Sequence, residues 1–405
     1  MNDYDVVIVG GRAAGASTAL LLARAGLRVA VLERSRLGSD TVSTHALMRA
    51  GVLQLSRWGV LPDLVAAGTP AIRTIAFHYA DGVTAHVSLR PSPGVAALYA
   101  PRRHLLDRVL AEAAAAAGAD VRHEAPVIGL LRDDTGRVQG VRVPGFGGSE
   151  RRIRAGLTIG ADGVGSLVAR EVGSAFVSQG RAASAVLYRY VADVPSEGYH
   201  WGYGDAAAAG LIPTNAGETC VFVSTTPSRM RMLRREGAED AFDRLLDGFP
   251  PAISGAVRAG SPAGHLHGWR GVPGYVRRSS GPGWALIGDA GYFKDPITTH
   301  GLTDALRDAE LLSEAVLADR GDASDEAWTR YEDTRDRLSK DLIEVTESVC
   351  RYDWSPDRIR TLLRRVSGAM SDEMDHLSAR LEPGRTALGS GHPDGWGLAV
   401  GSGHD

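Results

Sequence analysis

Three segments rich in glycine and aspartate hold the residues best suited to binding chemistry. GGRAAG begins at Gly10, GADG begins at Gly160, and GDAGYFKDPITTHG runs from Gly288 to Gly301. Glycine lets a backbone approach a ligand closely, and an aspartate at the end of a strand accepts hydrogen bonds from ligand hydroxyl groups. Each segment alone is weak evidence, but their order predicts a chain that wraps one large nucleotide cofactor from three separated places.

The first segment lies in a strand, turn, helix, strand pattern. Residues 4–9 form a continuous apolar run typical of a buried parallel strand, residues 16–25 are rich in alanine and leucine, and residues 27–32 form a second strand that ends at Glu33. In this arrangement a pyrophosphate lies over the helix N-terminus, and the acidic residue accepts hydrogen bonds from two ribose hydroxyls. Arg12 replaces the usual middle glycine and supplies a positive charge where phosphate is expected.

The third segment is the most specific of the three. Residues 284–287 read as a short buried strand, and an eleven-residue loop containing Pro296 leads to a helix that begins near Gly301. A helix N-terminus stabilises the negative charge that a reduced flavin carries near N1 and the C2 carbonyl. Asp289 is expected to accept hydrogen bonds from ribityl hydroxyls. Together the three segments predict FAD as the cofactor.

The remaining cofactor candidates lie between these segments. Asp162 follows a predicted strand at residues 157–159 and is expected to fix the loops around the pyrophosphate. Residues 101–107 open a helix, and Arg103 near its start is expected to reach the FAD, with a surface arginine as the alternative.

The sequence between the second and third segments changes to short alternating runs. Residues 185–191 and 219–224 read as strands of an antiparallel sheet that covers the flavin, with another part of this sheet expected from residues 71–99. His45 and His300 are the candidate catalytic residues, because each lies in a segment expected beside the isoalloxazine. Either histidine can donate a hydrogen bond or act as a base; the alternative is a histidine that only braces a loop.

The predicted fold class is α/β, with a Rossmann-like FAD domain built on a parallel sheet, an antiparallel-sheet substrate domain and a C-terminal helical segment. The helical segment is expected to pack against the FAD domain. The predicted boundaries are 1–70, 100–174 and 284–340 for the FAD domain, 71–99 and 175–283 for the substrate domain, 341–388 for the C-terminal helices, and 389–405 for a flexible tail.

Composition limits the classes of partner. A net charge of −3 and 23% charged residues give no electrostatic reason to expect nucleic acid or a membrane surface. The two cysteines match no metal-ligand spacing, so no metal is expected. No apolar stretch is long enough for a membrane span, and a strand that starts at Tyr4 leaves no room for a signal peptide. A cytoplasmic monomer or homodimer with a small-molecule substrate is expected.

With these residues in hand, the chain resembles the single-component FAD-dependent monooxygenases of the p-hydroxybenzoate hydroxylase type, in a superfamily that also holds geranylgeranyl reductases and flavin halogenases. The resemblance covers about residues 1–340. In that family the glycine fingerprint and terminal acid hold the AMP half, the arginine corresponding to Arg103 lies along the cofactor, and the Gly-Asp pair holds the ribityl chain. The resulting cofactor-binding candidates are Gly10, Arg12, Ala13, Ala14, Gly15, Glu33, Arg34, Arg103, Val127, Asp162, Gly163, Gly288, Asp289, Pro296, Thr299, Gly301 and Leu302.

The chain departs from the family pattern beside the flavin. Gly291-Tyr292 stands where many relatives have Ala-His, and Asp295-Pro296 stands where a Pro-Pro pair is usual. None of the seven tryptophans lies in the W-x-W-x-I-P segment of the halogenases, so that branch is not expected. A second glycine fingerprint for a nicotinamide dinucleotide is also missing, which agrees with NAD(P)H as a transient co-substrate.

The resemblance implies a monooxygenase that uses NAD(P)H and O2, through a flavin C4a-hydroperoxide, to oxygenate a small aromatic or polycyclic natural-product substrate. One alternative is a reductase or dehydrogenase of the geranylgeranyl reductase type. A second alternative is a non-catalytic flavoprotein that sequesters a planar ligand.

Overall fold

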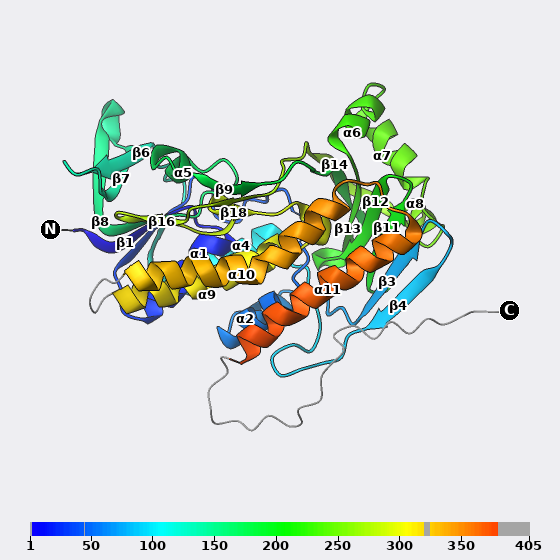
Figure 1. Ribbon diagram of the computed structural model, residues 1–405, viewed down its shortest axis with the longest axis horizontal. Coiled ribbons are helices and arrows are strands. Elements are labelled where there is room, and N and C mark those ends of the chain that lie inside the picture. Colours follow the sequence, from blue (N-terminus) through cyan, green and yellow to red (C-terminus); the bar gives the residue numbers. More distant parts are fainter. Residues whose placement is uncertain (1, 44, 320–324, 380–405) are drawn as a thin grey trace.

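The computed structural model describes residues 2–43, 45–319 and 325–379, so the predicted tail at 389–405 lies outside the described residues. Two large sheets lie side by side, with long helices running along both (Figure 1). The α/β fold class is confirmed, with a parallel sheet, a largely antiparallel sheet and C-terminal helices.

The first sheet carries the nucleotide-binding pattern. Its central strands pair in parallel in the order β17, β8, β1, β2, β5, while β16 pairs antiparallel with β17 and the β6–β7 hairpin joins the edge of β8. These strands are β1 (Tyr4–Val9), β2 (Val29–Leu32), β5 (Asp120–Arg122), β6 (Gly129–Arg132), β7 (Val138–Pro144), β8 (Glu150–Gly160), β16 (Ser280–Gly281) and β17 (Trp284–Leu286). The strand order reverses at β1, where α/β proteins bind ligands at the carboxyl ends of the strands.

The helices of this half bury the apolar side chains that the sequence pattern indicated. They are α1 (Ala13–Arg24), α2 (Arg49–Arg57), α3 (Leu61–Ala66), α4 (Arg103–Ala116), α5 (Leu167–Glu171) and α9 (Gly301–Ala318). Helix α1 packs against both α4 and α9. The core between them includes Leu20, Leu106, Leu306 and Leu312, each fully buried. This packing brings the N-termini of three sequence-distant helices to one side of β1.

The second sheet has seven strands in the order β14, β10, β13, β12, β11, β3, β4. Their bounds are β3 (Thr74–Tyr79), β4 (Thr84–Ser88), β10 (Ala185–Ala192), β11 (Tyr199–Gly204), β12 (Ala207–Pro213), β13 (Glu218–Thr225) and β14 (Ser261–Trp269). All neighbours are antiparallel except β11 and β3, which are parallel. A parallel pair needs a long connection, and the 119 residues between Tyr79 and Tyr199 provide it.

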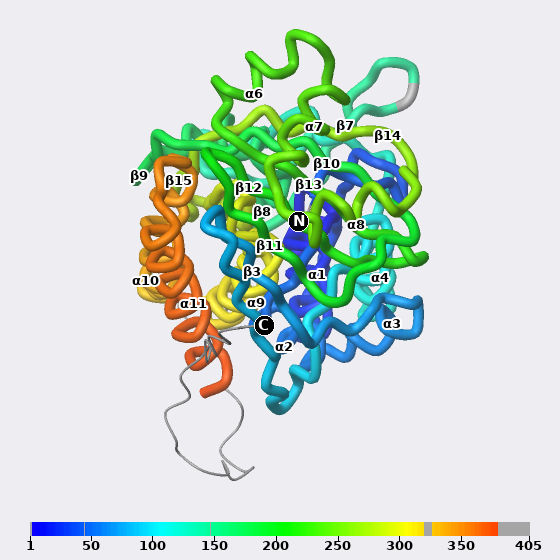
Figure 2. Tube along the Cα trace, turned by 90° about the vertical axis from the view of Figure 1, so that its right-hand side faces the viewer, coloured from blue at the N-terminus to red at the C-terminus, as the bar shows by residue number. Residues whose placement is uncertain are grey.

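Different helices cover the two faces of this sheet. Helices α6 (Pro227–Leu233), α7 (Ala238–Leu246) and α8 (Ser254–Ala259) cover one face, where Phe242 and Phe249 pack on Leu187 and Val223. On the other face Tyr188, Tyr190 and Trp201 share a core with residues from the C-terminal helices, such as Leu362. Figure 2 shows α11 and α10 on one side of the strands and α6 above them.

The C-terminal segment consists of α10 (Asp325–Val349) and α11 (Pro356–Ser378). The expected domain boundary at residues 340 and 341 falls within α10. The segment was expected to pack against the FAD domain, and α10 does contact α9 there. It also packs on the second sheet, because Val345 and Val349 of α10 join the core of that sheet. The segment therefore bridges the two halves. No described helix is long and apolar enough to cross a membrane.

A small third sheet links the halves. It contains β9 (Phe176–Gln179), β15 (Tyr275–Arg277) and β18 (Tyr292–Phe293) in the order β18, β15, β9. The sequence predicted an irregular loop from Ala290 to His300, whereas the structure has β18 and a short 3-10 helix at Pro296–Thr298 within it. The reason is pairing with β15, which lies fewer than twenty residues upstream and could not be recognised from the loop itself.

Candidate FAD and catalytic site

The turn after β1 is packed so closely that only glycine fits. Gly10 has φ of 100°, and a Cβ atom there would lie 2.4 Å from the carbonyl oxygen of Ala161. A Cβ atom on Gly15 would lie 1.9 Å from the carbonyl oxygen of Gly10. Both contacts are far inside van der Waals distance, so the first and second glycine segments form one compact turn. Ala13 and Ala14 follow at the start of α1.

Glu33 is held rigidly at the end of β2. Its carboxylate accepts hydrogen bonds from the backbone N–H of Gly11 at 2.7 Å and of Ser35 at 2.8 Å. Burial by itself would raise the pKa of Glu33, but the hydrogen bonds from Gly11 and Ser35, together with the charge of Arg12, outweigh burial and lower the pKa. Glu33 is therefore a fixed carboxylate beside the turn that a pyrophosphate would occupy.

Arg34 is exposed, and Val127 is half-buried between β5 and β6. The backbone of Ala125, two residues before Val127, donates to the carbonyl of Glu33. The structure therefore brings Val127 close to the end of β2.

Two arginines share one carboxylate where α1 and α4 begin. Arg12 Nη1 lies 3.1 Å from Asp107 Oδ2, and Arg103 Nη2 lies 3.1 Å from the same oxygen. The positive charge of Arg103 also acts to lower the pKa of both Asp289 and His45. A contact of Arg103 with the cofactor stays a prediction.

Asp162 binds its own turn. Its Oδ1 accepts from the Ser166 hydroxyl and its Oδ2 accepts from the backbone N–H groups of Leu167 and Val168, which caps α5. Burial raises the pKa of Asp162. The carboxylate therefore shapes the loop that carries Gly163, and it is the backbone of this loop that touches Gly10.

The third segment meets the first through Gly288, where an added Cβ would lie 3.1 Å from Ala14 Cβ. Asp289 follows with its side chain partly exposed, and none of the described residues donates a hydrogen bond to its carboxylate. Burial raises the pKa of Asp289 to about 6, although the charge of Arg103 acts in the opposite direction. This carboxylate can accept hydrogen bonds from a ligand, and ribityl hydroxyls are suitable donors.

The N-terminus of α9 is open. Pro296 starts the short 3-10 helix, Thr299 adopts a left-handed φ of 52°, and His300 occupies the N-cap position of α9 without making a side-chain cap. Gly301 is exposed and Leu302 is half-buried. The first N–H groups of this helix are thus available to a negatively charged partner.

These features fit FAD. The turn at Gly10 and Gly15 is as tight as a nucleotide-binding turn requires, Glu33 is a fixed acceptor at the end of β2, and Asp289 is an acceptor without a donor among the described residues, next to the open end of α9.

His45 lies in the loop before α2 and adopts φ of 65°. Its Nε2 is hydrogen-bonded to the Tyr190 hydroxyl of β10, and its Nδ1 is buried without a hydrogen-bond partner. Burial lowers the pKa of His45 to about 3, so the ring is neutral near pH 7. Burial also raises the pKa of Tyr190 and keeps its phenol protonated.

The loop that carries His45 contacts the first turn of α9, because the Met48 N–H donates to the Thr303 hydroxyl at 3.1 Å. On the sheet side, Arg102 lies over the Tyr190 ring, 3.5 Å from the ring centroid, and Tyr188 stacks on His267 at 4.9 Å. His45, Tyr190 and Arg102 therefore form a polar cluster between the cofactor half and the second sheet.

His300 is placed differently, inside a buried ionic network. Its Nε2 donates to Glu373 Oε2 of α11 at 2.6 Å, and Arg307 Nη1 lies 2.8 Å from Glu373 Oε1 and 3.0 Å from Asp304 Oδ1. Lys294 forms an ion pair with Asp304. The Nδ1 of His300 is buried without a hydrogen-bond partner among the described residues.

His300, Asp304 and Glu373 offer ligand atoms within 4.8 Å of one another. Two protein cations, Arg307 and Lys294, already neutralise the two carboxylates, so we assign no metal to the group. Glu373 could not be recognised as a partner of His300 from the sequence. It lies 73 residues away in a charged helix, and no local sequence pattern marks it.

The comparisons with known proteins agree with this geometry. A family model described as an FAD binding domain matches residues 3–346. The chain belongs to this family. It is an FAD-dependent oxidoreductase.

Among curated relatives, the digeranylgeranylglycerophospholipid reductase of Methanosarcina mazei is 28% identical over 84% of this chain and 82% of the relative. The Thermoplasma volcanium enzyme of the same name is 27% identical over 85% of both chains.

Solved structures show the same fold at lower identity. PqsL of P. aeruginosa, in complex with 2-aminobenzoylacetate, superposes with a TM-score of 0.76 at 22% identity, over 89% of this chain and 99% of that chain. The flavin-dependent brominase Bmp2 gives a TM-score of 0.75 at 18% identity, over 93% and 98%. At these identities the likeness shows the fold alone.

Proposed function

We propose that this FAD-dependent oxidoreductase is a monooxygenase with a small organic substrate, an aromatic or polycyclic compound. The overall reaction would convert substrate, O2, NAD(P)H and a proton into hydroxylated substrate, water and NAD(P)+. When bound, FAD supplies the electron transfer and the activation of oxygen.

The observation that carries the proposal is the closed polar cluster of His45 and Tyr190. Both side chains are almost fully buried, at 1% and 4% exposure, and they lie where the second sheet meets the loop beside α9. Oxygen transfer by a flavin needs a site from which water is excluded. The pair supplies a neutral imidazole and a protonated phenol, which can orient a substrate hydroxyl and carry its proton.

The other parts of the chain do the positioning. Glu33 and Asp289 are acceptors for the two sugar portions of the cofactor, and the open end of α9 favours negative charge on the reduced ring. Arg103, whose charge acts to lower the pKa of both Asp289 and His45, would add positive charge between the cofactor and substrate sides.

A second candidate is a reductase that adds two hydrogens to a carbon–carbon double bond. It is favoured by the curated relatives, which carry the name of a geranylgeranyl-lipid reductase and align with more than four fifths of this chain. In this case the Tyr190 phenol would provide the proton that accompanies hydride transfer.

One experiment separates the candidates. The enzyme is incubated with NAD(P)H, 18O2 and a panel of aromatic and isoprenoid compounds, and products are analysed by mass spectrometry. The monooxygenase proposal expects a product that gains one 18O atom with matching O2 consumption. A product that gains two hydrogens without 18O supports the reductase instead. Stoichiometric ligand binding with no NAD(P)H consumption contradicts both and favours a sequestering flavoprotein.

A further inference from the structure

A cavity of about 670 Å³ lies away from the His45 cluster, between the third sheet and the C-terminal half of α10. Its volume falls within the roughly 300–1,000 Å³ typical of small-molecule sites. Apolar side chains form part of the wall, including Val177 of β9, Phe293 of β18 and Ile343 of α10. Val177 is 67% exposed, which is unusual for a large aliphatic side chain on a strand.

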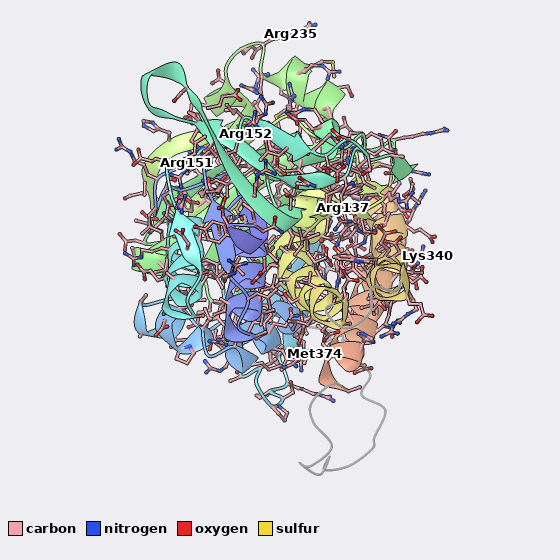
Figure 3. All side chains as sticks on the ribbon, turned by 90° about the vertical axis from the view of Figure 1, so that its left-hand side faces the viewer. Arg137, Arg151, Arg152, Arg235, Lys340 and Met374 are labelled. Carbon is pink, nitrogen blue, oxygen red and sulfur yellow. The ribbon has the colours of Figure 1, made fainter. Side chains whose placement is uncertain are left out.

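Besides the buried Lys294, which is paired with Asp304, four basic side chains line the same cavity: Arg181, Arg337, Lys340 and Arg351. All four are exposed, and none forms an ion pair within the part of the chain that the structure describes. Lys340, a residue of α10, is labelled in Figure 3. Both walls of the cavity contribute basic side chains, because Arg181 follows β9 while the other three belong to α10 or follow it.

Four acidic residues also line the cavity, and each has a partner in the chain. Asp295 accepts from the backbone N–H of Ser184 at 2.6 Å, and Glu344 lies 4.0 Å from Arg365. Glu347 Oε1 accepts from the backbone N–H groups of Arg181 and Ala182 at 2.9 and 3.0 Å, and Asp336 is paired with Arg335 at 2.6 Å. The two hydrogen bonds to Glu347 also fix the backbone of Arg181 and Ala182 beside the cavity. The positive charges are therefore available to a ligand, while the nearby acidic residues already have partners.

We propose that this cavity is a second binding site, and that its ligand carries a phosphate group next to an apolar or aromatic portion. The phosphate would be held by the four basic side chains, because guanidinium groups bind phosphate oxygens with paired hydrogen bonds. The apolar portion would cover Val177, Phe293 and Ile343. A nucleotide and an amphiphilic phosphate such as a lipid phosphate share this chemistry.

The site has a direct connection to the third cofactor segment. Phe293, Lys294 and Asp295 line the cavity and belong to the stretch that joins Asp289 to α9. Tyr275, also in the lining, donates from its hydroxyl to the carbonyl of Asp289. The proposal goes beyond the proposed function, since it concerns equilibrium binding at a separate place and does not depend on whether the product gains oxygen.

The test is calorimetric titration of the FAD-loaded enzyme with two probes, 2′,5′-adenosine bisphosphate and dodecyl phosphate. Adenosine and dodecanol serve as probes that lack the phosphate. We expect saturable binding of at least one phosphate probe and at least tenfold weaker binding of its phosphate-free counterpart. Binding of the adenosine compound identifies a nucleotide site, and binding of dodecyl phosphate alone identifies a site for amphiphilic phosphates.

Charge-reversal variants locate the site. The variant Arg337→Glu with Lys340→Glu should weaken binding at least tenfold, and Arg181→Glu on the opposite wall should weaken it independently. The matched control is Arg234→Glu with Arg235→Glu, which makes the same change in net charge at exposed residues outside the cavity. Figure 3 shows Arg235 well separated from Lys340. Absence of binding by both phosphate probes, or equal loss of affinity in the control, would overturn the proposal.

Discussion

Replacing Glu373 with glutamine tests whether α11 is fastened to the cofactor half by the buried ionic network. Glu373 accepts from His300 and pairs with Arg307, and both partners are almost completely buried. The amide keeps the shape of the side chain but removes its negative charge. Arg307 keeps Asp304 and Asp308 as partners, while His300 loses its only hydrogen bond to a carboxylate in the described chain.

The magnitude follows from the pKa of Glu373. Burial alone would raise this pKa, but His300 and Arg307 outweigh burial and lower it to about 2. Against an ordinary value of 4.5, this corresponds to about 3 kcal/mol of stability at pH 7. A loss of stability of similar size, about 3–5 kcal/mol, is expected when one partner of a buried ion pair is removed. Because the folded pKa is the lower one, this contribution is present above about pH 4.5 and is lost as the pH falls toward 2.

The assay is urea unfolding at a fixed excess of FAD, followed by circular dichroism. Glu373→Gln should lower the free energy of unfolding by about 3 kcal/mol at pH 7. Asp372→Asn is the matched control, since it removes the same charge from the neighbouring exposed position of α11 and should change stability by less than about 0.5 kcal/mol. Equal unfolding midpoints for the two variants would refute the assignment of stability to the network.

Three further predictions concern the site itself. Gly15→Ala should abolish FAD retention, because its Cβ would lie 1.9 Å from the carbonyl oxygen of Gly10; normal flavin content after gel filtration would contradict this. Burial raises the pKa of Asp289 to about 6, so the FAD affinity should be constant above pH 6 and fall up to about tenfold per pH unit below it. Fluorescence titrations measure this affinity, and Asp289→Asn should show no such pH dependence. Tyr190→Phe should retain FAD but lower kcat by at least about tenfold through loss of the phenol bonded to His45; unchanged kcat in steady-state assays would remove the pair from the mechanism.

Much of the cofactor half could be predicted from the sequence because local patterns specify it. The strand at Tyr4–Val9 and the helix that begins at Gly301 are found where the apolar periodicity places them. The glycines at 10 and 15 were informative because a tight turn excludes side chains at these positions. Such signals lie within about thirty residues and depend on backbone geometry.

The features that sequence missed depend on contacts across long stretches of chain. Glu373 reaches His300 from another helix, and β18 exists only because β15 pairs with it. The parallel contact of β3 with β11 is of the same kind. The start of α11 did have a local signal: the Ser355 hydroxyl accepts from the Arg358 N–H, and Pro356 follows it, within the region predicted as C-terminal helices.

The most direct test of the account is the flavin content of the purified protein. A chain that wraps FAD with its three glycine segments, Glu33 and Asp289 should be yellow when isolated and release one FAD per chain on denaturation. Protein that is folded by circular dichroism yet colourless, and that fails to bind added FAD in a fluorescence titration, would contradict the central claim.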